Sequence, residues 1–143
     1  MKIKIKRFDK ELPLPKYQTE GAAAFDLTAR EAVTIEPSTV GYVPVNIALE
    51  VPSGYFLLVA ARSGTHKKGL MMANGIGIID PDFRGDGDEV KVAYYNFGAK
   101  PVLIEKGERI AQATLVTISK AEWEEKDVLE NKTRGGFGST GSK

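Results

Sequence analysis

Residues 42–61 read Tyr-Val-Pro-Val-Asn-Ile-Ala-Leu-Glu-Val-Pro-Ser-Gly-Tyr-Phe-Leu-Leu-Val-Ala-Ala. Apolar, mostly β-branched or aromatic side chains fill two runs, and a Pro-Ser-Gly turn at residues 52–54 separates them. Such runs favour strands, and Pro with Gly between them is typical of a short connection. We therefore predict strands over residues 42–51 and 55–61.

The same rhythm continues on both sides of this stretch. Alternating Lys and Ile at residues 2–6 predict a half-buried or edge strand, with Ile3 and Ile5 on one face. Further β-rich runs lie at residues 32–35, 90–95 and 110–118. Many short strands separated by turns indicate an all-β barrel or sandwich.

Two other stretches lack this pattern. Residues 121–131 have few apolar side chains and a poor amphipathic stripe, so we expect a short helix there at most, and a further turn at residues 65–69. From residue 131 onward the chain is rich in Gly and Ser, which predicts a flexible arm. We divide the chain into a barrel domain at residues 1–131 and an arm at residues 132–143.

Composition excludes several classes of protein. The 143 residues suffice for one domain, and 20 Lys and Arg against 19 Asp and Glu leave a formal charge of +1. So balanced a charge argues against a general nucleic-acid or membrane-surface binder. No cysteine and a single histidine exclude a thiolate nucleophile and a His-rich metal site. With no apolar run of membrane-spanning length, we expect a cytoplasmic protein without membrane or nucleic-acid partners.

Residues 73–89 combine an apolar run with a dense acidic turn. They read Ala-Asn-Gly-Ile-Gly-Ile-Ile-Asp-Pro-Asp-Phe-Arg-Gly-Asp-Gly-Asp-Glu. A carboxylate at a strand end beside glycine, as at Asp80, can contact a ligand through its side chain and the nearby backbone. An EF-hand loop starting there does not fit, because Lys91 stands where the bidentate glutamate is needed. A solvated hairpin turn explains the same residues.

Arg62, Ser63 and Gly64 follow the predicted strand at residues 55–61. A forked cation, a hydroxyl and an unobstructed backbone amide together suit phosphate oxygens. An ordinary turn is the alternative interpretation.

The tail carries a Gly-Gly-Phe-Gly-Ser-Thr-Gly run at residues 135–141. A Walker loop is excluded, because it needs Gly-Lys-Ser/Thr and here Gly141 is followed by Ser142 and Lys143. A linker would explain the glycines but not Phe137, an aromatic that needs a surface to cover.

Two weaker segments carry polar residues in apolar surroundings. Asp26 lies in the apolar run at residues 21–27, where a capping or core-edge carboxylate is as good an interpretation as a metal or water partner. Arg109 and Gln112 alternate with apolar residues at 107–113, as they would on the polar face of a strand.

Taken in order, these segments resemble the five motifs of the trimeric dUTP diphosphatases, the dUTPase family. The ordered set is Ala-Phe-Asp-Leu, Arg-Ser-Gly, Gly-Ile-Ile-Asp with Asp-Phe-Arg-Gly, Gly-Glu-Arg-Ile-Ala-Gln and Gly-Phe-Gly-Ser-Thr-Gly. It covers about residues 21–141 and is far more specific than any one motif. The resemblance implies a jelly-roll-like β-barrel in a homotrimer, with the flexible arm of one subunit closing over a shared site. It also implies hydrolysis of dUTP to dUMP and pyrophosphate with Mg²⁺.

The resemblance further implies a role for each motif residue. Asp80 would orient and deprotonate the attacking water, Asp26 would hold metal-bound water, and Phe83 would stack on the deoxyribose. The substrate-binding residues it implies are Arg62, Ser63, Gly64, Asn74, Gly77, Ile79, Phe83, Gln112, Arg134, Phe137, Ser139 and Thr140.

Within that set the resemblance separates three tasks. Asn74 would hold the water or the uracil, and the backbone at residues 77–79 would pair with the uracil edge. Arg62, Ser63, Gly64 and Gln112 would bind the phosphates. From the arm, Phe137 would cover the base, whereas Arg134, Ser139 and Thr140 would contact the phosphates.

This sequence departs from the family pattern at a few positions. Phe83 stands where most members have Tyr, Ala61 where many have Pro, and Ile76 where Pro is frequent. The turn at residues 85–89 is longer and more acidic than usual, and Arg134 lies closer to the tail aromatic.

Two alternatives belong to other functional classes. A related dCTP deaminase would need an additional catalytic pattern that the sequence does not display. A regulatory sensor would bind dUTP and a protein partner but release negligible pyrophosphate, so turnover distinguishes it from an enzyme.

Overall fold

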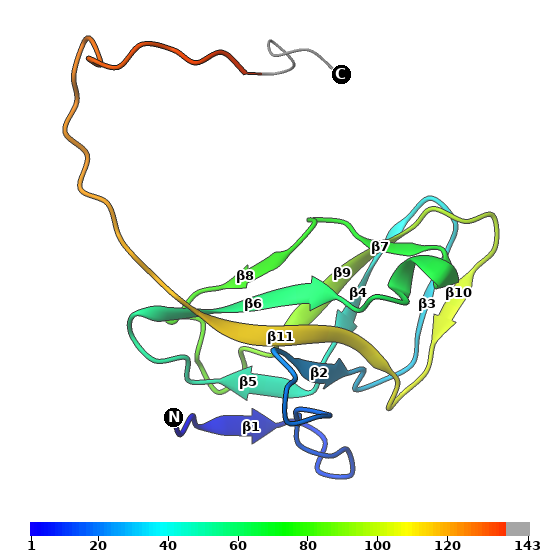
Figure 1. Cartoon of the computed structure of the whole chain (residues 1–143). Coiled ribbons are helices and arrows are strands. Elements are labelled where there is room, and N and C mark those ends of the chain that lie inside the picture. The colour runs from blue at the N-terminus through cyan, green and yellow to red at the C-terminus, as the bar shows by residue number, and fades with distance from the viewer. Residues whose placement is uncertain (137–143) are drawn as a thin grey trace.

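The computed structural model describes residues 1–136, and this part of the chain folds as strands around one core (Figure 1). The strands are β1 (Ile5–Arg7), β2 (Phe25–Thr28), β3 (Val33–Ile35), β4 (Val40–Pro44), β5 (Ile47–Leu49), β6 (Tyr55–Ala61), β7 (Leu70–Met72), β8 (Gly77–Ile79), β9 (Lys91–Asn96), β10 (Val102–Ile104) and β11 (Arg109–Thr117). A 3-10 helix, η1 (Thr65–Lys68), forms at the predicted turn. The prediction of an all-β fold is confirmed.

Antiparallel ladders join the strands into two larger sheets and two pairs. The sheet orders are β2-β11-β6-β8, β4-β9-β7, β1-β5 and β3-β10. β11 is the longest strand and pairs with β2 on one side and β6 on the other. Side chains from both larger sheets, such as Leu57 of β6 and Val92 of β9, belong to one buried cluster.

The strand predicted over residues 42–51 is wrong in one respect, because it is two strands. Asn46 adopts a left-handed conformation with φ 68° and separates β4 from β5. After this break β4 pairs with β9, whereas β5 pairs with β1. A left-handed residue cannot continue a ladder, so it redirects the chain from one sheet to another.

The N-terminal strand is an edge strand, as predicted, since within residues 1–136 β1 pairs with β5 alone. It begins at Ile5 rather than at residue 2. Ile3 and Ile5 line the same apolar groove, which agrees with their predicted common face.

Residues 121–131 form no helix. The chain leaves the barrel after β11 and runs away from it (Figure 1). Trp123 is 93% exposed, and Val128 and Leu129 are each 79% exposed. A segment with so few apolar contacts has nothing to stabilise a helix of this length. None of the helices within residues 1–136 has the length and apolar character of a membrane span.

Tyr94 of β9 connects the two larger sheets through the core. Its ring is fully buried, and its hydroxyl donates a hydrogen bond to the carbonyl oxygen of Ile110 at 2.5 Å. Ile110 lies at an irregularity in the β11–β2 ladder, between Arg109 and Ala111, so its carbonyl gains a partner from a side chain. Burial raises the pKa of Tyr94 to about 12, which keeps the phenol protonated as a donor.

We expect Tyr94→Phe to destabilise the fold by about 1–3 kcal/mol, because the ring volume stays while a buried carbonyl loses its donor. Urea unfolding followed by circular dichroism measures the change. Tyr17→Phe is the matched control, since Tyr17 is 54% exposed and should lose little. An unfolding midpoint equal to that of the unmodified protein would contradict the role of this hydrogen bond.

Candidate active site

Three motif residues meet at one end of the four-stranded sheet. Gln112 of β11 lies opposite Asp26 of β2 on one side and opposite Ala60 of β6 on the other. Arg62 directly follows β6 at this end. Strand pairing therefore brings together residues that are far apart in the sequence.

The Asp26 carboxylate is the centre of this group. Its Oδ1 lies 2.9 Å from Nε of Arg62, and its Oδ2 lies 3.0 Å from Nη1 of Arg109. Arg62 also donates through Nη1 to the carbonyl oxygen of Arg109 at 3.2 Å. Both guanidinium groups are partly exposed, so they offer further donors to an anion from solvent.

Arg109 belongs to this group although sequence reasoning gave it no role. The motif at residues 107–112 contains Arg109, but the contact with Asp26 does not follow from that motif, because Asp26 comes from another strand. Gln112 completes the group and donates through Nε2 to the carbonyl oxygen of Ala61 at 3.0 Å, which holds its side chain over the end of β6.

Ser63 and Gly64 form the exposed turn between β6 and η1. The turn is held by a hydrogen bond from the Thr65 amide to the Arg62 carbonyl at 3.0 Å. A side chain at Gly64 would contact nothing within 4 Å in this chain. The turn thus presents its backbone to a ligand or to another subunit.

β8 carries the second group of predicted site residues. It pairs with β6 and is the edge strand of its sheet, so one side of its backbone has no strand partner among the described residues. Gly77 is buried close to β6, and an added Cβ would lie 3.1 Å from Cβ of Val59. Ile79 ends the strand, whereas Asn74 is exposed in the turn before it.

Asp80 follows β8 and opens the acidic loop. Its carbonyl oxygen accepts a hydrogen bond from the Phe83 amide at 3.1 Å, which forms a tight turn with the Asp80 side chain exposed. Phe83 is 41% exposed and is not part of the core. An exposed carboxylate and an exposed aromatic ring therefore lie at the two ends of one turn.

One chain does not bring the two groups together. Leu57 lies opposite Ile79, so Asp80 is near the start of β6, whereas Arg62 follows its end. Six residues of extended strand separate these positions by about 20 Å. Arg134 lies on the exposed arm, and Phe137, Ser139 and Thr140 lie outside the described residues.

The carboxylates within residues 1–136 suit a metal ion that is held mainly by water and substrate phosphates. No three His, Asp or Glu side chains of this part of the chain gather as a metal cage. Mg²⁺ is usually held by one or two carboxylates, water and substrate phosphates. Asp26 supplies such a carboxylate beside the guanidinium groups, so the residues present fit a phosphate-bound Mg²⁺.

The comparisons with known proteins agree with this fold. The dUTPase family model matches residues 10–141. Deoxyuridine 5'-triphosphate nucleotidohydrolase of Helicobacter pylori strain P12 is 44% identical over 146 residues, which cover 99% of this chain and 97% of that protein. Among solved structures, the Staphylococcus bacteriophage 80alpha dUTPase G164S mutant with dUpNHpp has a TM-score of 0.85 at 24% identity, covering 98% of each chain. Streptococcus mutans dUTPase has a TM-score of 0.75 at 25% identity, covering 83% of this chain and 98% of that one.

These matches place the structure among the jelly-roll-like β-barrels of nucleotide hydrolases. The chain belongs to the dUTPase family.

We expect Arg62→Lys to weaken the binding of inorganic triphosphate about tenfold, because a lysine cannot hold Asp26 and still present a planar fork to phosphate. Isothermal titration calorimetry measures the affinity. Arg84→Lys makes the same exchange on the acidic loop and should leave the affinity unchanged. Equal affinity of Arg62→Lys and the unmodified protein for triphosphate would show that Arg62 does not bind the anion.

Proposed function

We propose that this protein hydrolyses dUTP to dUMP and pyrophosphate by Mg²⁺-assisted attack of water on the α-phosphate. This reaction supplies dUMP and keeps uracil out of DNA. The observation that carries the proposal is the meeting of Asp26, Arg62 and Gln112 in a chain of the dUTPase family. The 44% identical relative, named for the same reaction, supports it.

Asp80 is the general base in this proposal. Hydrolysis of a phosphate anhydride needs a positioned water and neutralisation of charge more than a protein nucleophile. The exposed side chain of Asp80 at the end of β8 supports this role, because it is open to solvent water. Asn74 would help to hold the water or the uracil.

The uracil and the sugar bind beside β8. The free backbone edge at Gly77 and Ile79 supports pairing with the polar edge of the base. Phe83 would pack against the deoxyribose, so that a ribose 2′-hydroxyl would clash or lose its hydrogen bonds.

The triphosphate binds at the other group. Arg62, Ser63, Gly64 and Gln112 would hold its oxygens, and Asp26 would bind the metal through water. When bound, Mg²⁺ supplies neutralisation of the phosphate charge. The partly exposed guanidinium of Arg62 supports this assignment, since its free N–H groups remain available.

A homotrimer would complete the site. Asp80 lies near the start of β6 and Arg62 follows its end, so a base from one subunit and a phosphate group from another could share one substrate. Val40, Tyr42 and Met71 form an exposed apolar patch on the β4-β9-β7 sheet, which supports burial against a second copy.

The arm is the last part of the proposal. We divide the protein into a barrel at residues 1–131 and an arm at residues 132–143 that closes over a neighbouring site. Phe137 would cover the base, and Arg134, Ser139 and Thr140 would contact the phosphates. The 93% exposure of Trp123, which lies between β11 and the arm, supports an arm that is free to reach another subunit. The cytoplasmic location stays a prediction.

The test is pyrophosphate release with dUTP, dCTP, dTTP and UTP in the presence of Mg²⁺. We expect turnover of dUTP and little of the others. Asp80→Asn should lower turnover about 10²–10⁴-fold while dUTP still binds, because an amide keeps the size but cannot accept the proton. Binding without turnover in the unmodified protein would favour the sensor, and an active Asp80→Asn variant would assign the base elsewhere.

The preference for deoxyribose should depend on Phe83. We expect Phe83→Ala to narrow the ratio of kcat/KM for dUTP over UTP about tenfold, because the truncated side chain leaves room for the 2′-hydroxyl. Phe83→Tyr is the control and should keep the ratio. If the ratio survives in Phe83→Ala, another residue discriminates between the sugars.

A further inference from the structure

Glu89 is a buried carboxylate at the point where the acidic loop rejoins the barrel. Residues 82–87 are exposed, whereas Glu89 is 9% exposed. Within the loop the backbone bonds are short-range, such as the Asp88 amide to the Gly85 carbonyl at 3.1 Å. The loop therefore depends on its ends for a fixed position.

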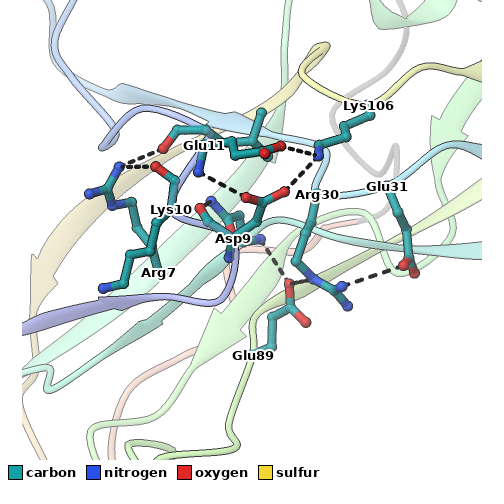
Figure 2. A network of polar contacts seen from close by, with 10 residues as sticks. Arg7, Asp9, Lys10, Glu11, Arg30, Glu31, Glu89 and Lys106 are labelled. Atoms are coloured by element: carbon teal, nitrogen blue, oxygen red, sulfur yellow. Dashed lines mark hydrogen bonds and ion pairs between the residues drawn. The ribbon is translucent and has the colours of Figure 1, made fainter.

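The carboxylate of Glu89 has two donors from two other parts of the chain. Its Oε1 accepts from Nε of Arg30 at 2.8 Å and from the backbone amide of Asn46 at 2.9 Å. Asn46 is the left-handed residue between β4 and β5, so its amide has no strand partner and Glu89 supplies the acceptor. Figure 2 shows Arg30 reaching Glu89 from one side.

Further polar contacts connect Asn46 to Asp9 and Asp9 to Lys106. The Asn46 side chain accepts from the Asp9 amide at 2.6 Å and donates to the Asp9 carbonyl at 3.0 Å. The Asp9 carboxylate lies 2.7 Å from Nζ of Lys106 (Figure 2). Hydrogen bonding to Lys106 lowers the pKa of Asp9, and the bond to Glu89 raises the pKa of Arg30.

Three members of this network stand close in sequence to proposed site residues. Arg30 comes four residues after Asp26, Glu89 six residues after Phe83, and Lys106 six residues before Gln112. The network thus joins the ends of the three segments that carry the two site groups.

We infer that the Arg30–Glu89 pair is a positioning element for the hydrolysis, which fixes the end of the loop at residues 80–88 and with it Asp80 and Phe83. The inference rests on the proposed function. A buried carboxylate with a guanidinium and a backbone partner cannot move without leaving charged and polar groups unpaired. By contrast, the Lys6–Asp86 pair that also touches the loop is exposed, and such pairs restrain little.

The test compares Glu89→Gln with Glu31→Gln. Both remove a negative charge beside Arg30, but Glu31 contacts Nη1 at 3.4 Å and lies outside the loop. We expect Glu89→Gln to speed amide deuterium exchange in residues 80–88 and to lower kcat about tenfold, since misplacement by about 1 Å can cost up to about 10²-fold. The dUTP preference over UTP should narrow as well, because Phe83 moves with the loop. Glu31→Gln should leave the amide exchange, kcat and the preference for dUTP over UTP unchanged.

A purely structural role would lower the melting temperature and leave kcat per folded site and the sugar preference unchanged, which would overturn the inference. Should Glu89→Gln fail to fold, Arg30→Met leaves Glu89 bonded to the Asn46 amide and should show the same effects in weaker form. Normal kcat and exchange in Arg30→Met would also overturn the inference. The exchange measurement needs no turnover. An inactive unmodified protein would refute the proposed function, and unchanged exchange of residues 80–88 in Glu89→Gln would still overturn the role of the pair.

Discussion

The backbone hydrogen bonds of β11 are the constraint on which the site depends. A central strand must satisfy its N–H and C=O groups on both sides, and β11 does so against β2 and β6. Because side chains alternate along strands, this pairing sets Asp26 opposite Gln112 and brings Arg62 beside both. The phosphate-binding candidates therefore come from a pairing of strands rather than from a local motif.

Much of this fold follows from local patterns. Alternation and turn formers predict β6 at its observed bounds, and β9 and β11 within one residue at each end. The break at Asn46 does not follow, because asparagine tolerates both extended and left-handed conformations and its choice depends on Asp9 and Glu89. Local sequence describes strands well, but it does not say where a chain changes from one sheet to another.

The candidate site also has residues that the sequence predicts and contacts that it does not. Asp80, Phe83 and Arg62 stand out from the sequence because ordered motifs mark them. Arg109 lies within such a motif as well, but its contact with Asp26, 83 residues away, does not follow from it, and neither does the contact of Glu89 with Arg30, 59 residues away. What a motif cannot contain is the geometry between segments, and here that geometry separates the base from the phosphate group along the length of β6.

The exposed side chain between β11 and the arm also has a spectroscopic consequence. Trp123 is the one tryptophan of the sequence and has almost no contact with the barrel. Indole emission depends on the polarity around the ring, so the tryptophan fluorescence of this protein reports the surroundings of the segment between β11 and the arm and almost nothing of the core. A blue shift would mark the moment at which that ring leaves water, without any added label.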